Sequence, residues 1–203
     1  MEWFPFYMNI EDADCLIVGG GTVALRKVEK LLPFRPRITV AAPEICEPIR
    51  SLDGIRTVYG RYAPELLDGR SFVIAASGDR EVNARVAADC RARSIPVNAV
   101  DSREDCTFIF PSMVKRGPLT AAFSTGGASP TAAILLKEQL EQQLPPNTEQ
   151  LLTWLDSVRP LVRGCVPEEK ARAALFRELT ERCFRTGKVP EEEELSALLE
   201  QYK

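Results

Sequence analysis

Short apolar runs alternate with helical patterns along the first half of the chain. Runs of strand length occur at residues 15–18, 38–42, 72–76 and 96–100, and helical patterns occur at residues 23–32 and 81–93. Strands that alternate with helices form a parallel sheet with helices on both faces. The pattern therefore predicts an α/β, Rossmann-type domain, in which ligands bind outside the carboxyl ends of the strands.

The pattern changes after Asp101. Two strand-like runs, at residues 107–114 and 119–124, flank a Gly-Pro turn and predict a hairpin. Ser129 is suited to cap a helix over residues 130–143, which begins with proline. The hairpin and this helix carry apolar residues that a compact sheet domain does not need, so we expect them to form a two-fold interface in a homodimer.

From residue 148 onward the pattern is helical and highly charged, with breaks at Pro160, at Pro167 and at residues 187–190. We therefore expect three parts in the chain. They are a Rossmann domain for NAD (residues 1–113), a small α+β dimerisation segment (114–147) and a C-terminal helical domain (148–203).

The composition narrows the chemistry that is available. The 203 residues include no histidine, which excludes Ser-His-Asp and Cys-His catalysis and leaves Asp, Glu, Lys, Tyr or Cys for any acid–base step. A net charge of −3 gives no reason to expect nucleic acid as a partner. Six cysteines without C-x-x-C spacing indicate free thiols, so we expect neither a metal site nor a disulfide scaffold.

No apolar run reaches the length of a membrane span. The first residues lack the basic and apolar regions of a signal peptide. These two features predict a soluble, cytoplasmic protein without a membrane partner.

The first strand leads into the sequence GGGTVA at residues 19–24, which fits the G-x-G-x-x-A pattern of a dinucleotide site. Gly19 allows the tight turn, Gly21 leaves room for a pyrophosphate, and Ala24 lets the following helix lie close to the sheet. Free N–H groups at the helix start favour the diphosphate. A glycine turn without a ligand is the alternative, but the strand before it and the helix after it favour a nucleotide.

The strand over residues 38–42 offers one candidate for ribose binding. Glu44 lies slightly beyond the usual position of the acid that contacts a ribose, and a solvated loop charge explains it equally well. No arginine directly follows this strand, which favours NAD over NADP. Small residues at the end of the strand over residues 72–76, Ala76 and Ser77, leave room for a cofactor.

Asp101 directly follows the last predicted strand of the sheet. Taken alone, an aspartate in this position is most often a turn former or a helix cap. Its predicted place at the carboxyl ends of the strands makes it a candidate proton acceptor, because the chain has no histidine.

The turn over residues 124–130 also has two interpretations. A glycine bend and a helix cap explain every residue in it. Alternatively, its backbone N–H groups and its Ser and Thr hydroxyls form a cradle for a substrate carboxylate. The basic pairs Arg26-Lys27 and Lys115-Arg116 are expected on solvated faces, although either pair is also suited to an anionic ligand.

Six stretches occur together in this chain: VGGGTVALRK (18–27), VAAPE (40–44), AAS (75–77), VNAVD (97–101), FIFPS (108–112) and STGGASP (124–130). In this order they resemble the siroheme-synthase family, and most closely its precorrin-2 dehydrogenase module. The resemblance covers about residues 4–145, and the helical tail is only loosely matched.

The resemblance implies a homodimer that oxidises precorrin-2 to sirohydrochlorin with NAD+, and some members also insert iron into sirohydrochlorin. It places the essential aspartate on Asp101, the glycine turn on residues 19–23 and the adenosine contact on Pro43 and Glu44. A serine that some members phosphorylate corresponds here to Thr125, which argues against regulation of that type.

Two sets of candidate site residues follow. The cofactor set is Gly19, Gly20, Gly21, Thr22, Val23, Pro43, Glu44, Ala76 and Ser77. The substrate set, chosen for a ligand with many carboxylates, is Ser124, Thr125, Gly126, Gly127, Ser129, Lys115 and Arg116, with Asp101 as the catalytic residue. The alternative function is a non-catalytic NAD or tetrapyrrole sensor or carrier, against which an intact Asp101 argues.

Overall fold

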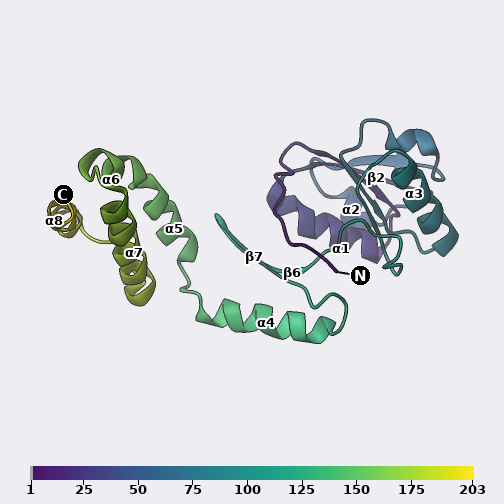
Figure 1. The fold of residues 1–203 in the computed structure, drawn as a ribbon. Helices are drawn as coiled ribbons and strands as arrows, with labels where there is room; N and C mark the ends of the chain where they lie inside the picture. The colour runs from purple at the N-terminus through teal and green to yellow at the C-terminus, as the bar shows by residue number, and fades with distance from the viewer. Residues whose placement is uncertain (1) are drawn as a thin grey trace. The chain divides into compact units, whose positions relative to one another are not determined.

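The computed structural model describes residues 2–203, which form two compact units (Figure 1). The first unit comprises residues 4–110, and the second comprises residues 111–203 together with residues 2 and 3. No helix within residues 2–203 is long and apolar enough to span a membrane.

The first unit contains a five-stranded parallel sheet with the strand order β3-β2-β1-β4-β5. The strands are β1 (Asp14–Val18), β2 (Arg37–Ala42), β3 (Arg56–Tyr59), β4 (Phe72–Ala75) and β5 (Val97–Ala99). The order reverses between β1 and β4, which is where ligands bind in sheets of this type. The predicted α/β, Rossmann-type fold is confirmed.

Both faces of the sheet are covered, because alternate residues of a strand point to opposite faces. Cys15 and Ile17 of β1 pack with α1 (Thr22–Leu31), whereas Leu16 and Val18 pack with α3 (Arg80–Ala92). Figure 1 shows these two helices on either side of the strands. A short helix, α2 (Glu47–Arg50), and two 3-10 turns, η1 (Leu32–Phe34) and η2 (Pro64–Leu67), complete the connections.

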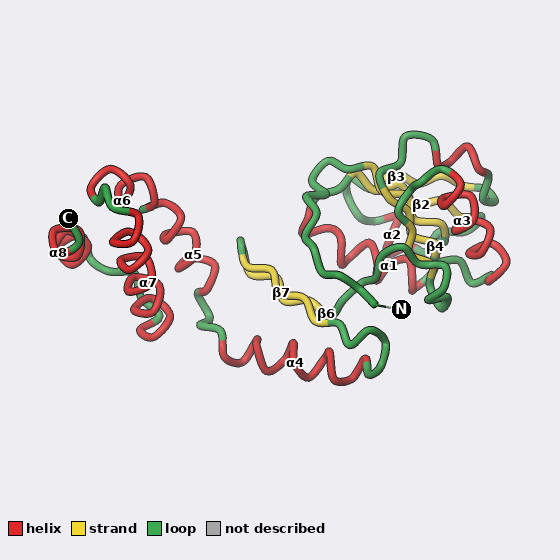
Figure 2. Tube along the Cα trace, viewed as in Figure 1, coloured by secondary structure: helices red, strands yellow, loops and turns green. Residues whose placement is uncertain are grey.

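The second unit begins with an antiparallel hairpin and a helix. The hairpin pairs β6 (Ser112–Arg116) with β7 (Leu119–Phe123), and α4 (Pro130–Gln143) packs along both strands (Figure 2). Ser129 caps α4 as the sequence predicts, because its hydroxyl accepts a hydrogen bond from the Ala132 N–H at 3.2 Å.

Four helices follow: α5 (Thr148–Ser157), α6 (Arg159–Cys165), α7 (Glu169–Thr186) and α8 (Glu192–Gln201). They share a separate core that includes the fully buried Leu151, Leu175 and Leu179. The three predicted breaks are confirmed. Pro160 lies in the first turn of α6, Pro167 separates α6 from α7, and α7 ends at Gly187 in a left-handed conformation.

Two elements of the sheet and the hairpin differ from the sequence-based expectations. Strand β3, whose residues Arg-Thr-Val-Tyr are only partly buried at the sheet edge, was not predicted. The run over residues 107–114 was predicted as one strand, whereas β6 begins only at Ser112. The apolar character of this run has another cause, because Phe108 and Phe110 pack against the core of the sheet domain.

Candidate active site

The glycine turn after β1 is closed by backbone contacts that exclude side chains. Gly19 has a φ of +129°, and a Cβ on it would lie 2.2 Å from the Ala76 carbonyl oxygen. A Cβ on Gly20 would lie 2.1 Å from the carbonyl oxygen of Glu44. The turn therefore brings the ends of β1, β2 and β4 within van der Waals contact of one another, which only glycine permits.

Gly21 differs from its two neighbours, because no heavy atom lies within 4 Å of the position of its Cβ. It is the N-cap residue of α1, and no side chain accepts a hydrogen bond at this cap. Thr22 and Val23, in the first turn of the helix, are exposed. Uncapped N–H groups beside open space suit the diphosphate of a dinucleotide, so the residues present fit an NAD cofactor.

At the end of β2, Pro43 and Glu44 are exposed. The chain beyond them returns to the glycine turn, where the Cys46 N–H donates to the Gly20 carbonyl oxygen at 2.8 Å. Glu44 therefore lies on a segment that is fixed to the dinucleotide turn, as a ribose contact requires.

At the end of β4, the backbone of Ser77 is held by a residue that the sequence analysis missed. The Asn83 side chain accepts from the Ser77 N–H and donates to the Ser77 carbonyl oxygen, both at 2.9 Å. Asn83 lies on α3 and is 4% exposed. Its amide fixes Ala76 and Ser77 beside Gly19. The sequence offered one signal for this role, because Asn83 is a polar residue among the buried positions of a helix.

Asp101 lies in a turn directly after β5 and is exposed. Its φ of +63° is in the left-handed region, which aspartate adopts more readily than most residues. Because β5 is parallel to β1, Asp101 lies at the same edge of the sheet as the glycine turn. The structure thus brings Asp101 and the cofactor set to one edge, as the sequence predicts for a parallel sheet.

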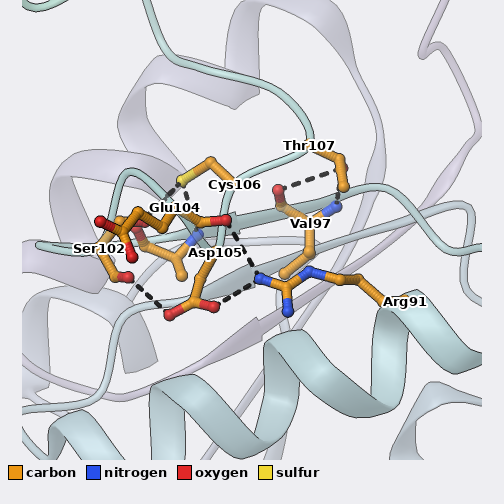
Figure 3. Close-up of polar contacts among 8 residues, drawn as sticks. Arg91, Val97, Ser102, Glu104, Asp105, Cys106 and Thr107 are labelled. Atoms are coloured by element: carbon orange, nitrogen blue, oxygen red, sulfur yellow. Dashed lines mark hydrogen bonds and ion pairs between the residues drawn. The ribbon is translucent and has the colours of Figure 1, made fainter. Parts of the chain in front are cut away.

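Polar contacts fix the loop that follows Asp101 (Figure 3). The Asp105 carboxylate accepts from the Ser102 hydroxyl and from the Arg91 guanidinium of α3, both at 2.5 Å. These two donors hold the pKa of the Asp105 carboxyl below its usual value. Thr107 adds a further connection, because its hydroxyl accepts from the Val97 N–H at 2.8 Å. The loop that carries Asp101 is therefore anchored to both α3 and β5.

Lys27 and Asn98 form a contact that the sequence analysis also missed. We expected Arg26-Lys27 on a solvated face, and Arg26 is exposed, but Lys27 is half-buried. The Lys27 ammonium donates to the Asn98 side-chain oxygen at 3.2 Å and lies 4.0 Å from the centre of the Phe110 ring. The spacing of Lys27 indicated that it is not fully solvated. It follows the buried Ala24 by three residues and precedes the buried Leu31 by four, so it shares a helix face with both.

The candidate substrate residues lie in the second unit. In the turn before α4, the Thr125 hydroxyl donates to the Ser129 carbonyl oxygen and accepts from the Ser129 N–H, and the Ser124 hydroxyl accepts from the Gly126 N–H. Gly126 and Gly127 have positive φ angles, and Gly127 is exposed. These contacts explain the residues of the turn by its conformation, without a ligand. Its role as a carboxylate cradle stays a prediction.

The two basic candidates lie on the hairpin. The Lys115 ammonium donates to the Gly117 carbonyl oxygen across the turn, and Lys115 is exposed. Arg116 is half-buried at the end of β6. Among residues 2–203, no group of three or more Cys, Asp or Glu side chains is placed to hold a metal ion.

The chain is similar to a family of NAD(P)-binding domains and to siroheme synthases. The model of a family described as putative NAD(P)-binding matches residues 6–112. The siroheme synthase of Thioalkalivibrio sulfidiphilus is 39% identical over 184 residues, which cover 89% of this chain and 38% of the relative. The siroheme synthase of Chromobacterium violaceum is 38% identical and likewise covers 89% of this chain and 39% of the relative. The chain thus spans about two fifths of the length of these curated relatives.

A solved structure described as "SirC, precorrin-2 dehydrogenase" is similar over nearly the whole molecule. The TM-score is 0.74 at 25% sequence identity, and the match covers 98% of each chain. The likeness therefore includes the second unit as well as the sheet domain.

Proposed function

The chain belongs to the putative NAD(P)-binding family, and we propose that it is a dehydrogenase that oxidises precorrin-2 to sirohydrochlorin with NAD+. One observation carries the proposal. The open N-terminus of α1 at Gly21 and the exposed carboxylate of Asp101 lie at the same edge of one parallel sheet. Similarity to siroheme synthases and to a precorrin-2 dehydrogenase supports this substrate.

The reaction removes a hydride and a proton from the macrocycle and creates one more double bond. Bound NAD+ supplies the hydride acceptor. Asp101 receives the proton or directs its departure, because its carboxylate is the exposed base nearest in sequence to the end of β5. Gly19 and Gly20 form the tight turn, and Gly21 leaves open space for the diphosphate. Asn83 fixes Ser77 beside this turn.

The cofactor contacts that we propose extend from the glycine turn to neighbouring strand ends. Glu44 binds the ribose hydroxyls of the adenosine side, next to Pro43. Because a carboxylate in this position repels a 2′-phosphate, NAD+ is favoured over NADP+. Thr22 and Val23 line the diphosphate at the start of α1, and Ala76 and Ser77 complete the site.

The substrate carries many carboxylates, and the net charge of the protein is −3, so local donors have to attract it. We assign this role to the turn over residues 124–129, through its hydroxyls and glycine N–H groups, and to Lys115 and Arg116. A helix of 14 residues, α4, starts directly after this turn, and its dipole favours an anion there.

We further propose that the protein acts as a homodimer through the segment over residues 114–147. In α4, Ile134, Leu135 and Leu136 are 48%, 53% and 47% exposed. Consecutive helical residues point about 100° apart, so this helix presents apolar surface on more than one side. Such surface marks a protein interface.

We also propose that the protein is cytoplasmic. The six free cysteines are compatible with the reducing environment of the cytoplasm.

The direct test is to incubate the purified protein with precorrin-2 and NAD+ and to follow the chromophore spectrum. We expect conversion to the sirohydrochlorin spectrum together with NADH formation. Asp101→Asn keeps the size of the side chain and removes the base, so turnover falls by roughly 10²-fold while NAD+ affinity is unchanged. Glu104→Gln removes an exposed carboxylate from the same loop and serves as the control.

The outcomes separate the parts of this proposal. No spectral change with the parent protein would overturn the dehydrogenase assignment and favour a sensor or carrier. An Asp101→Asn protein that works at the parent rate would exclude the general-base role. Adding Fe2+ to the product then tests ferrochelatase activity. If the same variant also loses metal insertion, both reactions use one carboxylate.

A further inference from the structure

Lys27 is half-buried, and its ammonium lies among groups that neither the cofactor nor the substrate assignment uses. It lies on α1, the helix that starts at the dinucleotide turn. Its ammonium contacts the Asn98 side-chain oxygen at 3.2 Å and the face of Phe110 at 4.0 Å from the ring centre. A lysine head group held away from water has to be compensated by such contacts, so this placement is specific.

Asn98 connects Lys27 to the loop that carries Asp101. It is 7% exposed and lies on β5, three residues before Asp101. Its side-chain nitrogen donates to the Phe108 carbonyl oxygen at 3.0 Å and to the Cys106 sulfur at 3.5 Å. The Asn98 amide thus joins the strand that enters the loop to the segment that leaves it, and Lys27 fixes the orientation of this amide.

The Lys27 charge is also sensitive to its surroundings. Burial and, to a smaller extent, the positive charge of Lys30 on the same helix lower the pKa of the Lys27 ammonium to about 8. The negative charge of Asp101, on the loop after β5, acts in the opposite direction. Lys27 and Asp101 are therefore close enough to influence each other electrostatically.

We propose that Lys27 is a positioning residue for the oxidation at Asp101, because its ammonium fixes the Asn98 amide at the base of the Asp101 loop and places a positive charge beside that loop. This inference rests on the proposed dehydrogenase function. It links the helix that receives the dinucleotide to the loop that handles the proton. The ammonium form is the active one, because neutral lysine neither supplies the charge nor holds the amide as firmly.

Kinetics of three variants test the proposal. Lys27→Met keeps the apolar stem and removes the charge, and we expect kcat to fall roughly tenfold, the scale of one hydrogen bond to a charged group. The KM for NAD+ stays unchanged. Lys27→Arg retains the charge and recovers part of the rate. Lys30→Met, an exposed lysine on the same helix, is the matched control and retains the parent kcat at neutral pH.

The pH profile distinguishes positioning from a purely structural role. In the parent protein, kcat decreases as the pH rises through the region near 8 in which Lys27 loses its proton. At high pH the parent rate approaches that of Lys27→Met. The methionine variant lacks this decrease, and Lys30→Met shifts it to higher pH, because removing the neighbouring positive charge makes the Lys27 ammonium easier to keep.

A second measurement is independent of turnover. In protein labelled with 13C at lysine Cε, the Lys27 resonance is assigned by its absence from Lys27→Arg and is titrated by NMR. Asp101→Asn removes an attractive charge and should lower the pKa of Lys27. This experiment gives an answer even if Lys27→Met does not fold or the parent protein does not oxidise precorrin-2.

The two proposals fail in different ways. A parent protein that leaves precorrin-2 unchanged overturns the dehydrogenase function. An active parent whose Lys27→Met variant keeps both the rate and the alkaline decrease overturns the role of Lys27 and leaves the dehydrogenase function intact. A Lys27 resonance that does not respond to Asp101→Asn overturns the electrostatic link between the two residues.

Discussion

The sheet domain and the segment over residues 112–143 bury their apolar side chains to very different extents. All residues of β4 and all but Asp14 of β1 are buried, and none of those is more than 6% exposed. In α4, by contrast, Ala133 is the one buried residue, and three consecutive large apolar residues are about half exposed. The sheet domain has a complete core of its own, whereas α4 leaves large apolar side chains partly exposed.

The three glycines of the turn after β1 also differ from one another, in the space that surrounds them. Gly19 and Gly20 are required by the fold, because a side chain on either would collide with backbone atoms. Gly21 has free space around it, so the fold alone does not explain why this position lacks a side chain. The cofactor that we propose beside the start of α1 would account for it.

The largest predicted effect tests this difference. Gly21→Asp places a carboxylate where the diphosphate binds, and like charges in contact cost several kcal/mol. We expect NAD+ affinity to fall on the order of 10³-fold, measured by calorimetry. The melting temperature should not decrease, because Asp is a favoured N-cap residue and Gly21 is the N-cap of α1. Gly164→Asp is the control, because Gly164 on α6 also has no heavy atom within 4 Å of its Cβ position.

The result would contradict the site assignment if folded Gly21→Asp bound NAD+ as tightly as the parent protein. Gly19→Ala should behave in the opposite way. Its φ of +129° and the contact with Ala76 predict a loss of folding stability rather than a selective loss of NAD+ binding.

The second effect concerns the independence of the helical core. Leu175→Ala creates a cavity at a fully buried position and should cost about 3 kcal/mol of unfolding free energy, measured with urea. Leu161→Ala, at a position 47% exposed, should cost much less. NAD+ affinity should stay constant in both variants, because the sheet domain has its own core. A parallel loss of NAD+ affinity in Leu175→Ala would show that the two units depend on each other.

The sheet was predictable because its strands are buried on both faces and appear as continuous apolar runs. The edge strand β3 has no such run, so its four residues gave no signal. The run that includes Phe108 and Phe110 looks the same as a strand in sequence, although its apolar residues pack onto the sheet domain without joining a sheet. An apolar run in the sequence therefore indicates that a segment is buried, but it does not show whether the segment pairs with a strand of a sheet.

The candidate site was predictable to the extent that backbone geometry defines it. Glycines after a strand and an aspartate after another strand of the same parallel sheet must share an edge. The supporting residues were not predictable in this way. Asn83 and Asn98 hold the backbone of nearby loops through side-chain hydrogen bonds, and Lys27 contacts Asn98 across 71 positions of the sequence. No periodic pattern encodes those partners.

The third effect tests the exposed face of α4. Leu135→Asp places a charge in the proposed dimer interface and should weaken the dimer by about 2 kcal/mol, roughly 30-fold in the dissociation constant. Sedimentation at several concentrations measures this change. Leu161→Asp introduces the same charge at another exposed leucine of the second unit and should leave the dimer intact. A parent protein that is monomeric at micromolar concentration would refute the interface.

The smallest effect concerns the polar anchor of the Asp101 loop, which contrasts with the apolar core beneath it. Asp105 accepts from Ser102 and Arg91, and these donors lower the pKa of its carboxyl in the folded protein. The resulting stability is fully present above the unfolded pKa of about 3.9 and is lost as the pH falls through the lower folded value. Asp105→Asn should therefore cost no more than about 1 kcal/mol at neutral pH, because the pair is partly exposed.

Below the folded pKa of Asp105, the parent protein and Asp105→Asn should have the same stability, because the parent carboxyl is then protonated and has lost its charge. Thermal unfolding of both proteins across the acid range measures the convergence. Glu104→Gln, at an exposed position of the same loop, should show no such pH-dependent difference. If the difference between the parent and Asp105→Asn persisted at the acid end, the anchor would act through shape rather than charge, and the loop would be held in the same way as the core.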